Sequence, residues 1–183
     1  MFVKTKIQGT NLRSFQMVRM FFLILFVLSV FSGCKIYSFT GASIPPEIKT
    51  VRVQYIDNKA RYTNSQLSPQ VTDRLRQKIL SQTKLTQVNN ENADYDISGF
   101  ISQYDVTTSG ISSQQVATNR LTVGINITLI DHKTPNAEPK NFSISRSFDF
   151  SANLTLPQAE QKLNDEMIRN LVDEIFNRIF SDW

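Results

Sequence analysis

Few residues of this chain are of the types that carry out chemistry. Its 183 residues include one cysteine and one histidine. His132 lies in "IDHKTPN", which we expect to form an exposed hairpin turn. A single histidine excludes multi-histidine metal sites, and a Ser-His-Asp triad would need this turn residue as its base. The sequence also lacks a GxGxxG or GxxxxGK[ST] phosphate loop and its carboxylates are scattered, so we expect neither catalysis nor a metal site.

Cys34, the single thiol, follows the most apolar run of the chain, "MFFLILFVLSVF" (20–31). This run has twelve residues, whereas a membrane-spanning helix needs roughly 20. Basic residues before the run, and the small residues Ser32 and Gly33 after it, are typical of a bacterial lipoprotein signal. We therefore expect cleavage before Cys34, a diacylglycerol on its sulfur and an acyl chain such as palmitate on the new amino terminus. We expect no cofactor besides this covalent lipid.

One position departs from the usual lipoprotein motif, because Phe31 stands where leucine is expected three residues before the cysteine. A plain signal peptide followed by an incidental cysteine and an uncleaved amino-terminal anchor are the alternative interpretations. The start of translation is also open, since Met1, Met17 and Met20 would each leave a sufficient signal.

Removal of the signal changes the charge of the chain. The whole chain has a formal net charge of +4, from 20 basic and 16 acidic residues. Four basic residues and no acidic ones precede Cys34, so residues 34–183 carry 16 of each and are neutral overall. Nucleic-acid binding normally requires a basic domain or patch. We therefore expect no nucleic-acid partner.

We divide the chain into a lipoprotein signal peptide (1–33), a lipid-attached tether (34–48) and a single domain (49–183). The tether contains Gly41 and the pair Pro45-Pro46, which favour an extended conformation. The domain is long enough to bury a core. With Cys34 acylated it has no cysteine for a disulfide, so packing must stabilise it.

Hydrophobic periodicity predicts four strands and two helices in this domain. Ser68 and Pro69 are typical of a helix start, with serine as the N-cap. Thr155, with Gln158 three residues later, resembles a capping box. The predicted strands are 49–57, 94–106, 119–131 and 141–150. The first predicted helix begins at Ser68, and the second runs from Thr155 to about Phe180.

The order β-α-β-β-β-α indicates an α+β domain, with a four-stranded, largely antiparallel sheet and two helices packed on one face. The parity of the apolar residues changes beside Gly99, which predicts a bulge or a bend in that strand. If both helices cover one face, the other face carries Thr, Ser, Asn and Arg side chains. The sequence thus predicts a polar, helix-free sheet face that is open to water or to a partner.

Four segments carry a family resemblance: "GCKIYSFTGASIPPEIKTVRVQYIDN", "SQTKLTQVNN", "NRLTVGINITLID" and "EIFNRIFSDW". The chain from Cys34 to Trp183 resembles the LPS-assembly lipoprotein LptE family, in its Bacteroidetes-type branch. The tether segment and the FNRIF-x-x-W pattern are the most specific parts. The resemblance implies a four-stranded sheet with two helices and a non-enzymatic lipoprotein at the inner leaflet of the outer membrane. Such a lipoprotein plugs the lumen of the LptD β-barrel, and together they insert lipopolysaccharide into the outer leaflet.

A neutral domain with a polar exterior suits a plug in a water-filled barrel. The residues after Cys34 lack the acidic cluster of a surface-export signal. By analogy with such signals, we expect the chain to be lipid-anchored to the outer membrane on its periplasmic side.

The resemblance does not identify residues that contact lipopolysaccharide. Family members are thought to bind it through basic residues, but no motif here matches those positions. Arg52, Arg120 and Arg146 are candidates by chemistry, because a guanidinium fork suits phosphate; a solvated or ion-paired arginine is the default interpretation of each. Arg146 shares the parity of the apolar residues in its strand, so we expect its stem to be buried and its head to reach the sheet edge.

Two other functions are alternatives to the plug. A lipid-anchored periplasmic carrier would bind a small amphiphile in a cleft between the sheet and a helix, and a surface adhesin would bind glycans. A deep apolar pocket between the long helix and the sheet would favour the carrier, and a filled core would favour the plug.

Overall fold

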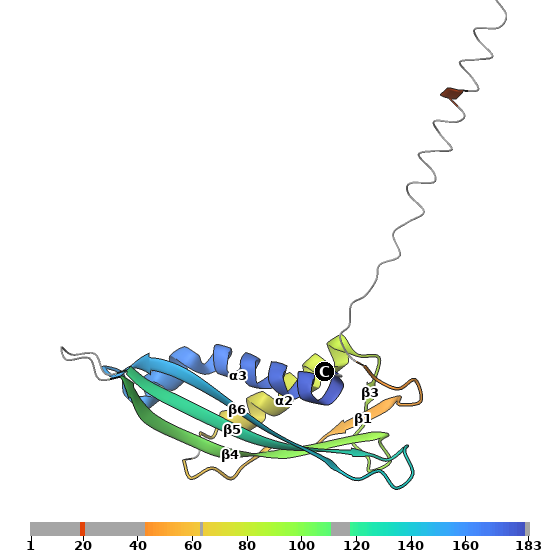
Figure 1. The fold of residues 1–183 in the computed structure, drawn as a ribbon, viewed down its shortest axis with the longest axis horizontal. Coiled ribbons are helices and arrows are strands. Elements are labelled where there is room, and N and C mark those ends of the chain that lie inside the picture. Colours follow the sequence, from red (N-terminus) through yellow and green to blue (C-terminus); the bar gives the residue numbers. More distant parts are fainter. Residues whose placement is uncertain (1–18, 21–42, 63, 111–117, 182–183) are drawn as a thin grey trace, which may run out of the picture. The chain divides into compact units, whose positions relative to one another are not determined.

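The structure, a computed structural model, describes residues 19–20, 43–62, 64–110 and 118–181. The chain divides into two units, Met1–Phe39 and Thr40–Trp183, and the second unit holds the folded domain (Figure 1). Cys34, the apolar run after Met20 and most of the predicted tether lie outside the described residues. The lipidation prediction therefore stays a prediction. Among the described residues, no helix is both long and apolar enough to cross a membrane.

The described residues of the domain form two helices and six strands of very different lengths. In chain order these are β1 (Thr50–Val53), β2 (Asp57–Asn58), α2 (Leu67–Gln82), β3 (Thr86–Gln87), β4 (Tyr95–Gly110), β5 (Thr118–Asp131), β6 (Lys140–Ser151) and α3 (Leu156–Phe180). The strands form one sheet in the order β3-β1-β4-β5-β6, and β2 pairs with β4 beyond the end of β1.

The sheet is mixed, and this corrects part of the sequence prediction. The α+β class with two helices is confirmed, but a four-stranded, largely antiparallel sheet is wrong. β1 runs parallel to both β3 and β4, and β2 is also parallel to β4. The physical reason is the crossover through α2, since parallel neighbours require a connection that returns the chain to the same end of the sheet. The two-residue strands β2 and β3 are too short for an alternating pattern to reveal them.

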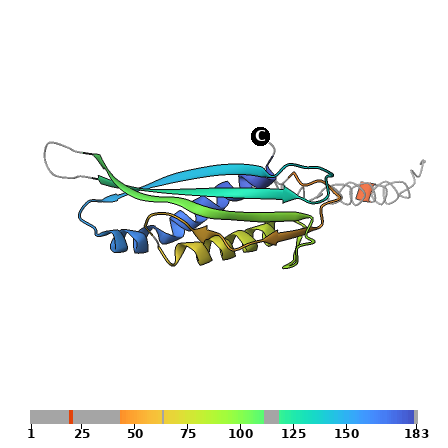
Figure 2. The same cartoon turned by 90° about the horizontal axis from the view of Figure 1, so that it is seen from below.

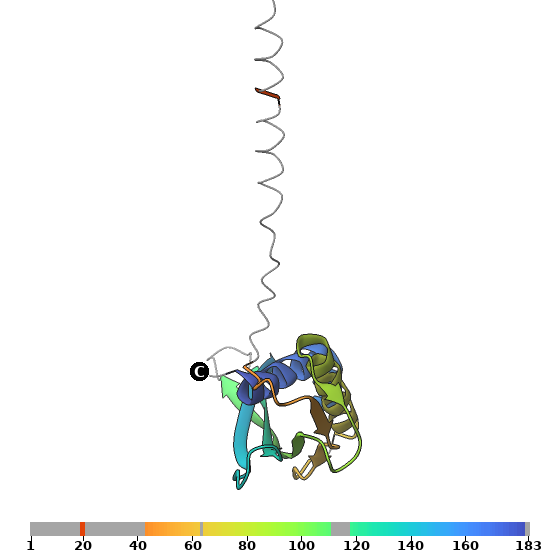
Figure 3. The ribbon, with the colours of Figure 1, turned by 90° about the vertical axis from the view of Figure 1, so that its right-hand side faces the viewer.

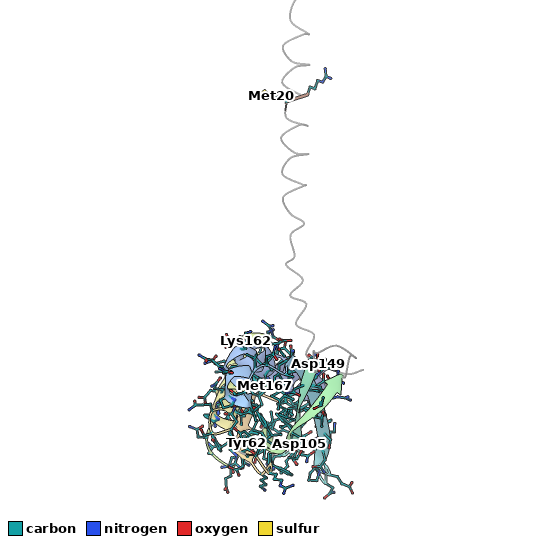
Figure 4. All side chains as sticks on the ribbon, turned by 90° about the vertical axis from the view of Figure 1, so that its left-hand side faces the viewer. Met20, Tyr62, Asp105, Asp149, Lys162 and Met167 are labelled. Carbon is teal, nitrogen blue, oxygen red and sulfur yellow. The ribbon has the colours of Figure 1, made fainter. Side chains whose placement is uncertain are left out.

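Both helices cover the same face of the sheet, as predicted. Figure 2 shows the long strands in one layer and α2 and α3 in the other. The end-on view of Figure 3 shows the sheet curving partly around the two helices. Figure 4 shows Met167 of α3 in the interior, with Lys162 on the outer side of the helix layer.

The inner face of the sheet forms the core with the helices. Apolar side chains on β5 alternate as predicted, and all five of them are buried: Leu121, Val123, Ile125, Ile127 and Leu129. The predicted apolar stripes of the helices are buried against them, including Val71, Leu75 and Ile79 of α2 and Met167, Leu171 and Ile175 of α3. Helix packing against an apolar sheet face is thus the main source of stability.

The predicted irregularity in β4 is confirmed, although it lies a few residues beyond Gly99. The register with β5 shifts between Ile101 and Gln103, so that Tyr104 points inward after Ile101. Gly99 is needed for a different reason: a Cβ there would lie 2.5 Å from the carbonyl oxygen of Asn126 and 2.6 Å from Cδ1 of Ile127. Glycine therefore permits the close approach of β5.

The two helices begin in different ways. α3 has the predicted capping box, in which Gln158 Oε1 accepts a hydrogen bond of 3.0 Å from the backbone N–H of Thr155. In α2 the predicted N-cap is wrong, because Gln66 occupies that position and Ser68 is a buried residue of the first turn. The helix therefore begins earlier in the chain than the cap pattern indicated, at Leu67, and both Leu67 and Ser68 are buried against the domain.

The end of the predicted tether is packed onto the domain. Ile48 is buried in the core and Ile44 packs against it, while the backbone N–H of Ser43 donates to the carbonyl of Phe180 at 2.6 Å. Asp94 fixes the next residues, since its Oδ2 accepts from the backbone N–H groups of Lys49 and Thr50 at 2.7 and 2.9 Å. These two hydrogen bonds lower the pKa of Asp94 from 3.8 to about 2. The domain therefore reaches back to Ser43.

Candidate functional site

The helix-free face of the sheet is the candidate site, and we call it the outer sheet face. Its residues alternate with the buried ones along every long strand, and they follow from the strand registers. They are Arg52 of β1 and Gln54, which directly follows β1; Asp96, Ser98, Phe100, Gln103 and Asp105 of β4; Arg120, Thr122, Gly124, Asn126, Thr128 and Ile130 of β5; and Asn141, Ser143, Ser145, Ser147 and Asp149 of β6. Apart from Phe100, Ile130 and Gly124, every one of these side chains is polar, as the sequence predicted.

Neighbouring side chains on β5 and β6 hydrogen-bond to one another in successive rungs. Thr122 Oγ1 and Ser147 Oγ lie 3.0 Å apart, Ser143 Oγ donates to Asn126 Oδ1 at 2.7 Å, and Thr128 Oγ1 donates to Asn141 Oδ1 at 2.7 Å. Such cross-strand pairs each stabilise a sheet by a few tenths of a kcal/mol to about 1 kcal/mol. The face therefore satisfies much of its own hydrogen bonding and still exposes hydroxyl and amide groups to water.

Arg120 extends this series of rungs at the end of the sheet nearest the β4–β5 hairpin. Its Nε and NH2 donate to the two carboxylate oxygens of Asp149 at 2.7 and 2.9 Å. The hydrogen bond from Arg120 lowers the pKa of Asp149 below its ordinary value. Both side chains are about half exposed, so water and salt screen this pair.

Arg52 forms a more enclosed cluster at the other end of the outer sheet face. Its Nε and NH2 donate to Asp96 at 3.0 and 2.5 Å, and Gln54 Nε2 lies 3.1 and 3.0 Å from the same two oxygens. The Asp96 side chain is only 5% exposed. Burial raises its pKa, but hydrogen bonds from Arg52 and Gln54 outweigh burial, and the pKa lies below the ordinary value.

Besides the partly buried Ile130, the large apolar side chain on this face is Phe100, and it is partly covered. The ammonium group of Lys59 lies 4.6 Å from the centre of its ring. A cation over an aromatic face both shields the ring and is attracted to it. The outer sheet face therefore has no broad apolar patch.

The three predicted arginines do not form one site. Arg52 lies beside Asp96, which pairs with Ile130 of β5, ten residues from Arg120; at about 3.3 Å per residue this is roughly 30 Å. Arg146 lies on the opposite, helix-covered face and pairs with Glu174 of α3, which also pairs with Arg178. Its side chain is about half exposed at the edge strand β6, and the predicted burial of its stem stays a prediction. All three guanidinium groups are thus already paired with carboxylates.

The carboxylates that pair with the three arginines were not identified from the sequence. Asp96 lies in "DYD", which was interpreted only as a strand start, and Asp149 and Glu174 carried no motif. Only the strand register could have revealed Asp96 and Asp149, since it places each directly across from its arginine. The single histidine, His132, is an exposed residue of the β5–β6 connection. Among the described residues, no three His, Cys, Asp or Glu side chains are placed to hold a metal ion.

The space between the sheet and the helices is filled. Ile125 of β5 and Leu171 and Ile175 of α3 are fully buried there. Two grooves lie between α2 and α3, and they are lined mostly by polar and charged side chains. The helix–sheet interface therefore shows the filled core that favours a plug over a carrier.

Comparison with known proteins gives a family match. The model of a family described as "LptE: Lipopolysaccharide-assembly" matches residues 48–179, which is more than half of the chain. The comparison with curated protein sequences gave no match.

Several solved structures are similar at low sequence identity. A minor lipoprotein from Acinetobacter baumannii is 17% identical, with a TM-score of 0.44, over 72% of this chain and 91% of that one. The rare lipoprotein B from Shewanella oneidensis is 18% identical, with a TM-score of 0.42, over 71% and 93%. PelC from Paraburkholderia phytofirmans, a dodecamer, is 13% identical, with a TM-score of 0.47, over 77% and 94%. These scores are too low to support any conclusion about function.

Proposed function

Because the chain belongs to the LptE family, which acts in lipopolysaccharide assembly, we propose that it is the non-enzymatic plug and assembly partner of an LptD-type outer-membrane β-barrel. The match over residues 48–179 carries this proposal, since it covers nearly all of the folded domain. The LptE family is non-enzymatic, and so is this chain. The tether segment and the FNRIF-x-x-W pattern place it, in our proposal, in the Bacteroidetes-type branch.

The outer sheet face supports the plug. A barrel lumen contains water, so a surface that lines it must be polar and must not aggregate. The hydrogen-bonded rungs of β5 and β6 meet both conditions, because each rung is satisfied within the face and still accepts water. We propose that this face lies against the water-filled lumen.

The proposed location is the periplasmic side of the outer membrane, with the lipid on Cys34 as the anchor. The supporting observation is the short apolar run followed by small residues and the single cysteine. One acyl chain binds a membrane only marginally, whereas two or more anchor a protein stably. A diacylglycerol with a further N-acyl chain on Cys34 would therefore hold the domain at the membrane.

The periplasmic carrier is the alternative, and the packing of the domain weighs against it. Ile125, Leu171 and Ile175 are fully buried where an amphiphile would have to insert. Filling that space with protein leaves a carrier without an apolar site, whereas a plug needs none.

We also propose Arg120, together with Arg52 and Arg146, as residues that contact lipopolysaccharide phosphate. Each would have to exchange its carboxylate partner for a phosphate, which suits the same guanidinium fork. Arg120 is the best residue to reverse, because its partner Asp149 is half exposed, whereas reversing Arg52 would place a second anion beside the buried Asp96. We expect the double variant R120E/R146E to bind purified lipopolysaccharide more weakly with an unchanged circular dichroism spectrum. Unchanged binding would remove Arg120 and Arg146 from the proposal.

The partner is tested by purification from the native host. The full-length chain with a carboxy-terminal tag is expressed, the outer membrane is solubilised gently, and the co-purifying proteins are identified. We expect a large β-barrel in equal molar amount. A lipoprotein that purifies as a monomer with bound lipid only would replace the plug by the carrier.

A further inference from the structure

A charged groove runs between α2 and α3 on the side of the helices away from the sheet, and we call it the interhelical groove. One part encloses about 510 Å³ and is lined by Arg74, Gln77 and Ser81 of α2 and Arg169 and Asp173 of α3, among others. A second part, of about 520 Å³, shares Arg74 and Arg169 and extends to Asp165. The two arginines from different helices therefore line both parts.

These arginines differ from most others in the domain. In the part of the chain that the structure describes, Arg52, Arg76, Arg120, Arg146 and Arg178 each pair with a carboxylate. Arg74 and Arg169 are exposed and have no hydrogen bond or ion pair within the described residues. Two guanidinium groups thus line one groove with their donors free.

The acidic residues near the groove do not cancel this charge. Asp73 pairs with Arg76 at 3.3 Å, and Asp173 pairs with Lys78 at 2.9 Å. Asp165 is the remaining carboxylate of the lining, and it accepts only a long contact of 3.4 Å from Asn164 Nδ2. Counted with Arg76, which pairs with Asp73, the groove has four cations (Arg74, Arg76, Lys78 and Arg169) against three carboxylates (Asp73, Asp165 and Asp173), so it keeps one excess positive charge that an anionic ligand would balance.

The two helices are held at a fixed separation on either side of the groove. Asn164 of α3 donates to Gln70 of α2 at 2.9 Å. Lys78 of α2 bonds to Asp173 and also lies 5.2 Å from the centre of the Phe176 ring of α3. Because these contacts join α2 to α3, the helix backbones that carry the arginines need little rearrangement to receive a ligand, which lowers the entropic cost of binding.

We propose that the interhelical groove binds the carboxylate side chains of an acidic segment of a partner protein. A guanidinium fork binds a carboxylate through two parallel hydrogen bonds, and the groove offers two such forks. A membrane surface fits less well, because docking on lipid needs an exposed apolar helix face. Here the apolar faces of α2 and α3 are buried, and Leu80 is the only large exposed hydrophobic residue that the structure shows on them.

The inference rests on the proposed function only for the identity of the partner, which would then be the barrel protein. The test uses the full-length chain in its host, with a photo-crosslinking amino acid in place of Gln77, which lines both parts of the groove. The crosslinked peptide is identified by mass spectrometry. We expect a peptide of a partner protein that contains two or more Asp or Glu residues.

Charge variants then test whether the arginines hold that segment. The double variant R74E/R169E should reduce the crosslinked product by about tenfold or more, because the loss of one charge-assisted hydrogen bond alone costs about an order of magnitude in affinity. The matched control R61E/K84E changes the charge equally at exposed residues outside the groove lining, and it should leave the product unchanged. Changing the acidic residues of the crosslinked peptide to lysine should restore the product with R74E/R169E.

The contradicting results are equally specific. A lipid adduct, no adduct, or an adduct that persists in R74E/R169E would overturn the inference. If the barrel still co-purifies with R74E/R169E under those outcomes, the proposed function stands and only the groove is excluded. If the wild-type chain retains no barrel, the proposed function itself fails.

Discussion

The two faces of the sheet are built from the same strands but differ in the polarity and burial of their side chains. The inner face of β5 is entirely buried apolar side chain, from Leu121 to Leu129. The outer face of the same strand is polar, and its side chains bond to those of β6. Burial of apolar area drives folding, whereas exposed hydrogen bonds add little to stability. The inner face therefore specifies the fold, and the outer face is free to serve a partner.

The largest expected effect is a truncation on the inner face. Ile125→Ala should lower the free energy of unfolding by about 2–5 kcal/mol, because it leaves a cavity in a packed core. The adjacent outer-face change Asn126→Ala should cost less than about 1 kcal/mol, since it removes one exposed hydrogen bond. Chemical denaturation of both variants measures the difference. Equal losses would show that the two faces do not differ in the way described.

The next largest expected effect on stability comes from the close approach of β5 to the backbone at Gly99. Gly99→Ala should cost about 1–3 kcal/mol, the usual range for overpacking, since its Cβ would meet Asn126 and Ile127 at 2.5 and 2.6 Å. Gly110→Ala in the same strand is the matched control, because a Cβ there has no atom within 4 Å. Thermal unfolding compares the two. A neutral Gly99→Ala would mean that β4 and β5 can separate without cost.

Two arginines of the outer sheet face should differ from each other. Arg52→Ala should destabilise the domain more than Arg120→Ala, because it leaves the buried carboxylate of Asp96 with Gln54 as its side-chain partner, whereas Asp149, the partner of Arg120, is half exposed. Unfolding by urea at neutral pH measures both variants. Equal losses in the free energy of unfolding would mean that the burial of Asp96 does not increase the cost of removing its arginine partner.

The effect of Arg52→Ala should also depend on pH. The folded-state pKa of Asp96 is lowered, so its charged form stabilises the domain above the ordinary value of 3.8, and this contribution is lost as the pH falls through the folded-state pKa. The difference between wild type and Arg52→Ala should therefore shrink on acidification. A difference that grows towards low pH would contradict the assigned cause.

The smallest expected effect is the loss of one rung. Thr122→Ala removes the contact with Ser147 and should cost about 0.2–1 kcal/mol. The Thr122→Ser variant keeps the hydroxyl and should restore most of that loss. Denaturation in parallel distinguishes them. A loss as large as that of Ile125→Ala would assign the outer face a role in the core.

Local patterns predicted the parts of this fold that depend on near neighbours in the sequence. The alternation of β5, the apolar stripes of the helices and the Thr155–Gln158 capping box follow from spacing alone. The parallel pairing of β1 with β3 and β4 does not, because strand direction depends on the crossover through α2. A solvated or ion-paired state was expected for Arg52, Arg120 and Arg146, but their partners could not be identified, since they are 44, 29 and 28 residues away. The polar outer sheet face was predicted, but not the bonds within it.

The central claim is that the outer sheet face lies against the lumen of a barrel partner. The most direct measurement places a photo-crosslinking amino acid at Thr122 and, separately, at Ser145 in the full-length chain, and identifies the products in intact host cells. We expect both positions to crosslink to one β-barrel protein, at residues that face its lumen. If the barrel co-purifies but neither position crosslinks to it, the outer sheet face is not the surface that it meets, and the claim fails.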